Sequence, residues 1–225
     1  MRSPTLLALC LIAGLQTAQA ASVQVTVLAR DGQPLPDAVV VLEPAAGQPM
    51  PAATPLNHTI TQEKMQFHPA VSVVPVGSRV KFANMDRWDH HVRGGPAGLV
   101  ATGTYGFEFR LAGREAGKNP PSSELALDKA GPVQLGCHLH GSMRGFVYVS
   151  PTPWAAKTSD TGVATLAEVP EGAMRLRIWH PDQLLDPAVI TVQVQAVTAV
   201  TAVNVPTQVQ PRKARRVQTA PSDTY

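Results

Sequence analysis

The sequence contains very little cysteine. Only Cys10 and Cys137 occur among its 225 residues, and Cys10 lies in an amino-terminal segment, residues 1–20, that we expect to be removed. Without that segment Cys137 is the single remaining thiol, which excludes a disulfide bond within the mature chain. A lone thiol in an oxidising compartment reacts readily unless burial or a bound metal protects it. The scarcity of cysteine therefore directs attention to the surroundings of Cys137.

Residues 1–20 have the composition of a cleaved export signal. Arg2 supplies a positive charge, an apolar core runs from Leu6 to Leu15, and Ala18-Gln19-Ala20 forms a small-residue cleavage pattern. The apolar core is shorter than the roughly 20 residues that a membrane-spanning helix needs. We expect cleavage after Ala20 and export to the periplasm, with no membrane span.

The sequence also lacks a long helical repeat and a strong excess of charge. Its formal net charge is only +3, part of which belongs to residues 206–225, a basic tail that we expect to be disordered and solvated. Nothing in this distribution points to a nucleic-acid partner. No Ser/His/Asp or paired-carboxylate signature stands out, so no enzyme is expected. Short alternating runs bounded by Gly, Pro and Asp are frequent, and they predict an all-β chain.

Three side chains with metal-binding chemistry follow one another closely around Cys137. The stretch from Gly136 to Met143 has the spacing C-x2-H-x2-M, which places Cys137, His140 and Met143 on one tight loop. Thiolate and thioether are soft ligands that favour copper(I), and imidazole accepts either oxidation state of copper. Two His, one Cys and a weak axial Met are the ligands of a blue-copper site. The sequence therefore predicts such a site, with a second His supplied from elsewhere.

Other interpretations of these residues are less specific. An isolated Cys is usually a small buried hydrophobe, and an isolated Met fills gaps in a core. A zinc site is the alternative metal centre, but structural zinc sites use Cys and His and not a thioether. The presence of all three residue types on one loop between two predicted strands favours copper.

The second His follows a predicted strand. Residues 76–84 have the pattern of a turn and an alternating strand, and His90 comes six residues after Asn84. This arrangement resembles the cupredoxin family of plastocyanin and amicyanin, and the short C-x2-H-x2-M loop is more similar to that of amicyanin. The resemblance implies a Greek-key β-sandwich over residues 58–150. It also implies one type 1 copper ion, with the ligands His90, Cys137, His140 and Met143.

The resemblance carries functional expectations as well. It implies a periplasmic protein that moves single electrons from a dehydrogenase to a c-type cytochrome by transient contact, as in methylamine utilisation. A copper-delivery protein without electron transfer is the alternative, although the sequence lacks the Met- or His-rich cluster expected for it. A third alternative is a structural β protein whose copper site is vestigial, and the complete ligand set argues against that. Only one H-x-H pair and one remaining Cys argue against a multicopper oxidase and a binuclear copper site.

Three further residues lie beside the expected ligands. Asn84 is expected to support the site from outside the ligand set. The resembled family usually has Asn where this chain has His91, and adjacent strand residues face opposite ways, so only one of His90 and His91 can point at the metal. His138 is expected on the surface near the copper, either as a solvated side chain or in the passage of electrons.

The segments on either side of residues 58–150 resemble the carboxypeptidase regulatory-like β-sandwich. The likeness lies in the turn from Asp31 to Ala38, the D-x-G turn at 160–162 and the P-x-G turn at 170–172. It implies one discontinuous domain, residues 21–44 with 158–205, that carries the copper domain as an insertion. Residues 22–44 are expected to form a β-hairpin that pairs with the carboxy-terminal strands. The alternative is a cupredoxin with irregular β-extensions.

Overall fold

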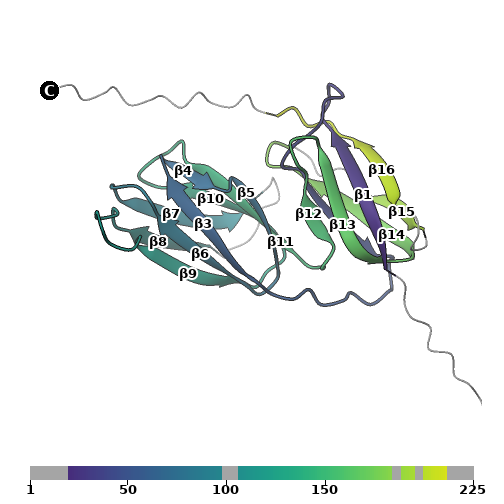
Figure 1. The fold of residues 1–225 in the computed structure, drawn as a ribbon, viewed down its shortest axis with the longest axis horizontal. Helices are drawn as coiled ribbons and strands as arrows, with labels where there is room; N and C mark the ends of the chain where they lie inside the picture. The colour runs from purple at the N-terminus through teal and green to yellow at the C-terminus, as the bar shows by residue number, and fades with distance from the viewer. Residues whose placement is uncertain (1–19, 98–105, 184–188, 196–199, 212–225) are drawn as a thin grey trace, which may run out of the picture.

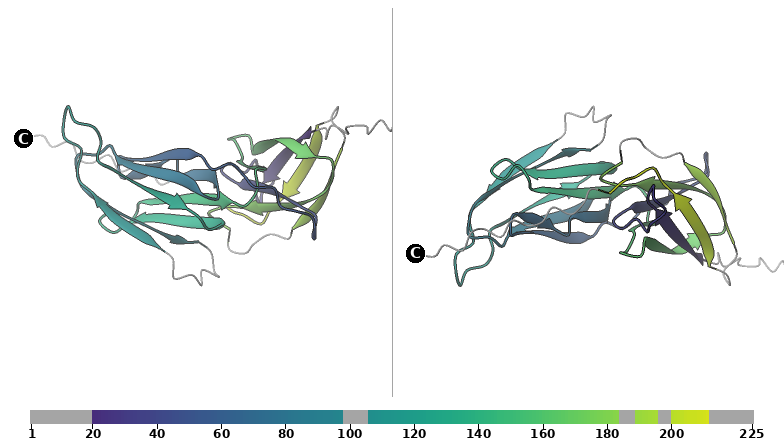
Figure 2. Two further views of the ribbon diagram at one scale, coloured as in Figure 1. Left: turned by 90° about the horizontal axis from the view of Figure 1, so that it is seen from below. Right: turned by 90° about the horizontal axis from the view of Figure 1, so that it is seen from above.

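The computed structural model describes residues 20–97, 106–183, 189–195 and 200–211. This part of the chain forms strands and no helices, so the prediction of an all-β chain built from β-sandwiches is confirmed. Two sandwiches lie one after the other along the long axis of the molecule (Figure 1), and they can be told apart in both further views (Figure 2). Within the described residues, no helix has the length and apolarity needed to cross a membrane.

The first unit, called the flanking sandwich, is built from both ends of the chain. One sheet has the order β13-β1-β16, and the other has the order β12-β2-β14-β15. The strands are β1 (Ala20–Leu28), β2 (Val39–Pro44), β12 (Ala155–Lys157), β13 (Val163–Pro170), β14 (Gly172–Trp179), β15 (Ile190–Val194) and β16 (Thr201–Pro206). Strands β1 and β2 each lie between strands from the carboxy-terminal half of the chain.

The prediction that residues 22–44 form a β-hairpin is wrong. Strands β1 and β2 belong to opposite sheets, and the segment between them crosses from one layer to the other. The physical reason is that both strands present an apolar face to the same core. Val23, Val25 and Val27 alternate inward along β1, and they meet Val40 and Leu42 of β2 in one buried cluster. Facing strands bury more apolar surface here than paired neighbours could.

The chain remains ordered beyond the last strand. The backbone N–H and the hydroxyl of Thr207 both donate to the carbonyl of Leu28, each at 2.9 Å, and Val209 is buried in the core of the flanking sandwich. The ordered chain thus runs past residue 205, where the sequence placed the start of a disordered tail. Residues 212–225 of that tail, like residues 1–19 of the expected signal, lie outside the described part.

The second unit, called the central sandwich, contains the residues expected to bind copper. Its sheets have the orders β5-β11-β10-β7-β8 and β4-β3-β6-β9. The strands are β3 (Asn57–Glu63), β4 (Gln66–His68), β5 (Val71–Pro75), β6 (Ser78–Asn84), β7 (His90–Pro96), β8 (Phe107–Leu111), β9 (Ser122–Leu127), β10 (Gly131–Cys137) and β11 (Arg144–Ser150). Apolar side chains from both sheets, among them Ile60, Phe82 and Val147, fill the space between them.

A third apolar cluster joins the two sandwiches. It contains Val39, Val41 and Trp179 from the flanking sandwich and Val71, Phe146 and Tyr148 from the central one. The Trp179 ring lies 5.6 Å from that of Phe146 and 5.7 Å from that of Tyr148, measured between centroids. This explains why β2 is apolar on both faces. Val40 and Leu42 point into their own sandwich, whereas Val39 and Val41 contact the neighbour.

Candidate metal centre

Three ligand atoms from two segments of the central sandwich form a nearly equilateral triangle. The Sγ atom of Cys137 lies 3.7 Å from Nδ1 of His90 and 3.5 Å from Nδ1 of His140, and the two Nδ1 atoms are 3.2 Å apart. The centre of such a triangle lies about 2 Å from each corner, which matches the bond lengths of first-row metals to imidazole and thiolate. The three side chains therefore fit one trigonal metal ion without rearrangement.

The strand ladder explains why these residues meet. His90 begins β7 and Cys137 ends β10, and the two strands are antiparallel neighbours in which Cys137 faces Val92. The chain then turns back into β11 through residues 138–143, and the N–H of Met143 donates to the carbonyl of His140 at 2.9 Å. This tight turn brings His140 to the end of the same two strands.

Met143 lies on the inner side of that turn. Its side chain is 4% exposed and belongs to the apolar cluster that also contains Cys137. The thioether is a soft ligand suited to a weak axial position next to a thiolate. The structure thus places Met143 in the same buried cluster as Cys137, which is compatible with an axial ligand.

Asn84 organises the loop that leads to His90. Its side-chain amide donates to the carbonyls of Trp88 and Ala112, each at 2.8 Å, and its Oδ1 accepts from the N–H of Asp86 at 2.9 Å. The residue is fully buried, and its bond with Asp86 is buried as well, whereas the two bonds from its amide are partly buried. Asn84 acts on the site through the backbone of the 84–90 loop and does not touch a ligand atom.

Asp86 is a functional residue that the sequence analysis missed. Its Oδ2 lies 3.0 Å from Nε2 of His90, and both side chains are buried. Since a carboxylate only accepts, Nε2 carries the hydrogen and Nδ1 keeps its lone pair for a metal. No pattern in the sequence marks it, because residues 85–89 form an irregular segment between β6 and β7 that has no periodicity to predict which side chains meet.

The carboxylate of Asp86 is itself held in place. It accepts hydrogen bonds from the N–H groups of Lys64 and Met65, at 2.7 and 3.1 Å. Burial raises the pKa of Asp86, but the bonds from Met65, His90 and Lys64 outweigh it and leave the pKa below the ordinary 3.8. Lys64 and Met65 adopt φ of 52° and 57° in the two-residue turn between β3 and β4, which directs both N–H groups at the carboxylate.

The thiol of Cys137 has a backbone partner. The N–H of His91 donates to Sγ at 3.4 Å, and Cys137 is only 3% exposed. This contact fixes the position of the sulfur at the corner of the triangle. The backbone of His91 thereby joins the two ligand segments, although its side chain does not.

The side chains of His91 and His138 point away from this centre. Their rings lie 4.8 Å apart, and each is near the carboxylate of Glu108 on β8. The alternation along β7 places His90 inward, where it is fully buried, and His91 outward. Of the seven residues singled out in the sequence, the structure brings His90, Cys137 and His140 together and buries Met143 in the same apolar cluster as Cys137. Asn84 supports the loop before His90, and the side chains of His91 and His138 lie outside.

His140 is the ligand candidate nearest to solvent. Its side chain is half-buried, and Leu139 beside it is 51% exposed. Burial, and then the neighbouring His90, hold the pKa of His140 below 6.5, although Asp86 opposes this. The neutral imidazole, which is the form that binds a metal, is thus favoured at neutral pH.

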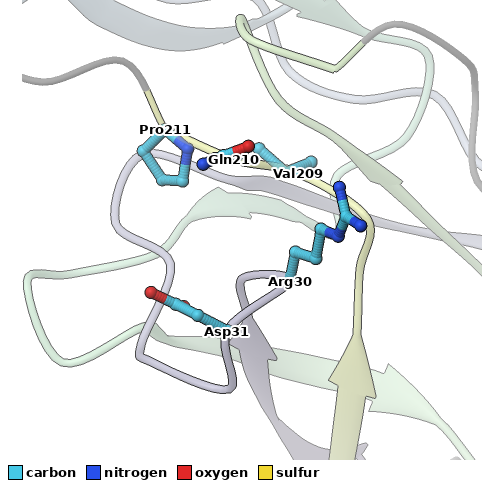
Figure 3. Close-up of a pocket in the computed structure, with 5 residues that line it drawn as sticks. All are labelled: Arg30, Asp31, Val209, Gln210 and Pro211. Atoms are coloured by element: carbon cyan, nitrogen blue, oxygen red, sulfur yellow. The ribbon is translucent and has the colours of Figure 1, made fainter.

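A hollow elsewhere in the molecule does not have this chemistry. It lies on the flanking sandwich, between the turn after β1 and the carboxy-terminal segment, and is lined by Arg30, Asp31, Val209, Gln210 and Pro211 (Figure 3). Its lining contains no His or Cys, and the Arg30 and Asp31 side chains point in different directions in the close-up. The triangle around Cys137 remains the strongest candidate site.

Comparisons with known proteins add a limited likeness. No family model and no curated protein matches the chain. A purple cupredoxin from Nitrosopumilus maritimus is similar over 41% of this chain and 99% of its own, with 18% identity and a TM-score of 0.34. An amicyanin from Paracoccus versutus is similar over 48% of this chain and 91% of its own, with 23% identity and a TM-score of 0.31. Both likenesses cover less than half of this chain.

Proposed function

We propose that the protein is a one-electron carrier, not an enzyme, with one type 1 copper ion bound by His90, Cys137, His140 and Met143. The observation that supports this most directly is the triangle of Sγ and two Nδ1 atoms with sides of 3.2–3.7 Å. The buried thioether of Met143 completes the ligand set of a blue-copper site.

A copper ion held there would supply a Cu(II)/Cu(I) couple, and the surrounding residues suit that use. The His90 ring is held by Asp86 and the Cys137 sulfur by the N–H of His91, while a backbone hydrogen bond between Met143 and His140 closes the loop that carries the other two ligands. Ligands held in this way keep their positions whichever oxidation state they bind. The ligands then reorganise little when the metal gains or loses an electron, as an electron carrier requires.

The half-buried edge of His140 and the exposed Leu139 offer a contact surface for redox partners. We propose a dehydrogenase as donor and a c-type cytochrome as acceptor, meeting the protein in the periplasm through small and transient interfaces. The export signal expected in residues 1–20 agrees with that location.

An absorption spectrum of the purified protein after addition of Cu(II) tests the copper assignment. We expect an intense band in the visible region from thiolate-to-copper charge transfer, and a colourless protein after addition of Zn(II). Cys137→Ser should abolish the band, whereas Ser142→Ala, an exposed change on the same loop, should leave it intact. Weak, pale absorption by the folded wild-type protein would overturn the proposal.

Copper delivery remains a second candidate function, because the half-exposed His140 leaves the site open on one side. The two functions differ in how fast copper leaves the protein. A carrier of electrons should retain Cu(I) against a competing chelator, whereas a delivery protein should release it readily to an acceptor. The burial of His90 and Cys137, at 0% and 3% exposure, favours retention.

A further inference from the structure

A second group of metal-binding side chains lies on the outer face of the central sandwich. It consists of His91, Glu108 and His138, which we call the outer triad. The Oε2 atom of Glu108 lies 3.8 Å from Nε2 of His91 and 3.6 Å from Nε2 of His138. The three potential ligand atoms are all within 4.8 Å of one another. None of them takes part in the triangle around Cys137.

The strand ladder holds the outer triad together. His91 faces outward from β7 because His90 faces inward, and Glu108 faces outward from the neighbouring strand β8. The N–H of His138 donates to the carbonyl of His91 at 3.0 Å, so the backbone holds the two residues side by side, with their rings 4.8 Å apart. Two of the three side chains are thus placed by hydrogen-bonded backbone before any ion arrives.

The charged residue next to Glu108 on the outer face of β8 pairs with a different carboxylate. Arg110, the next outward residue on β8, donates twice to Asp89, at 2.8 and 3.1 Å. In the part of the chain that the structure describes, the ion-pair partners of Glu108 are His91 and His138 alone. Arg93 is the cross-strand partner of Glu108, but the ion pairs that the described residues form with this carboxylate come from the two imidazoles.

We propose that the outer triad binds a divalent zinc or copper ion, as a second metal site separate from the one at Cys137. Two imidazoles and one carboxylate are the protein ligands of open zinc sites, in which water occupies the remaining position. Copper(II) binds such nitrogen and oxygen donors still more tightly, whereas copper(I) lacks the soft ligand it prefers. The distances of 3.6–3.8 Å need only small rotations of partly exposed side chains to close around an ion.

Such an ion would lie beside the first centre. His91 follows His90 in the chain, and His138 follows Cys137. A positive charge at this position favours the more reduced state of a neighbouring redox centre. If the proposed copper function holds, zinc at the outer triad raises the reduction potential of that centre.

Zinc titration of the metal-free full-length chain, followed by calorimetry, tests the proposal. We expect two bound equivalents in the wild type, and one in each of Glu108→Gln and His138→Asn, with the second affinity weakened at least about tenfold. Glu124→Gln is the matched control, because Glu124 is a partly exposed carboxylate paired with Arg79 on the opposite sheet. This control should retain two equivalents.

The outcomes separate the two sites. A single equivalent in the wild type that persists in Glu108→Gln and His138→Asn, or two undiminished equivalents in either variant, would overturn the outer triad. A colourless copper form would overturn the blue-copper function and leave the zinc stoichiometry unaffected, since zinc binding does not depend on that function. Circular dichroism of each variant verifies that the β-sandwich is intact.

Discussion

The carboxylate of Asp86 lies 3.0 Å from Nε2 of His90, on the side of the imidazole that faces away from Cys137. This contact fixes which ring nitrogen can bind a metal. It also connects the metal centre to the β3–β4 turn, since the same carboxylate accepts from Lys64 and Met65.

Replacing Asp86 should therefore weaken metal binding without removing a ligand. Asp86→Ala leaves the His90 ring free to rotate and to change tautomer, and loss of such a partner typically costs about 10–100-fold in metal affinity. Competition with a chelator measures this for Cu(II). Glu115→Ala, an exposed carboxylate in the 112–118 loop, serves as control and should bind as the wild type does. An affinity within twofold of wild type for Asp86→Ala would contradict the role given to Asp86.

The two adjacent histidines of β7 should respond oppositely to substitution. His90→Ala removes one corner of the triangle and should abolish the charge-transfer band, and added imidazole should restore part of it. His91→Asn keeps the backbone N–H that donates to Cys137 Sγ, so the band should remain. Absorption spectra of the two copper-treated variants compare them directly. If His91→Asn bleaches the protein and His90→Ala does not, the ligand assignment is shifted by one residue.

The sequence predicted the ligand candidates because their signals are local. Cys137, His140 and Met143 lie within one turn, strand alternation allows only one of His90 and His91 to face inward, and the six-residue distance from Asn84 favours His90. The sequence did not predict the role of Asp86, because its carboxylate is held by N–H groups of the β3–β4 turn, more than twenty residues away. It did not predict the contact of Glu108 with the two histidines for the same reason, since only strand pairing brings β8 beside β7.

The error over residues 22–44 has a different origin. A turn rich in Gly, Pro and Asp between two apolar strands is equally compatible with a hairpin and with a crossing between layers. The choice depends on the partner strands, and those of β1 and β2 come from residues 155–206. Pairing over such a separation is invisible to local patterns.

The stability of the flanking sandwich should depend on His180 at mildly acidic pH. Burial holds the pKa of His180 below 6.5, although Asp182, the backbone of Pro36 and Asp37 oppose this. Its Nδ1 accepts from the N–H of Asp182 at 3.0 Å. Below pH 6.5 the unfolded chain takes up a proton that the folded chain resists, so stability is complete above 6.5 and falls as the pH decreases toward the folded pKa.

Urea unfolding between pH 7.5 and 5 measures this effect. His180→Asn retains an acceptor near the position of Nδ1 and cannot titrate, so its free energy of unfolding should decline less steeply over that interval. His58 also has a pKa lowered by burial. His58→Asn is therefore the corresponding substitution in the central sandwich, and its pH slope is compared with that of His180→Asn. Equal pH slopes for wild type and His180→Asn would contradict the assignment.

The cluster between the sandwiches leads to the last prediction. We propose that residues 21–44 and 158–205 form one discontinuous domain and that residues 58–150 form an inserted one, coupled through Trp179. This side chain is 7% exposed and contacts Phe146 and Tyr148 across the boundary. Trp179→Ala should cost about 3–5 kcal/mol, the usual loss for a buried aromatic, and should let the two units unfold at separate urea concentrations.

Trp88→Ala is the control, because Trp88 is 39% exposed and its truncation should cost about 1 kcal/mol or less. Tryptophan fluorescence of Trp179→Ala reports the flanking sandwich when Trp88 is also replaced by Phe, because Trp154 is then the single remaining tryptophan, and the charge-transfer band reports the central sandwich. Coincident transitions in Trp179→Ala would show that the chain unfolds as one unit and that the proposed division is wrong.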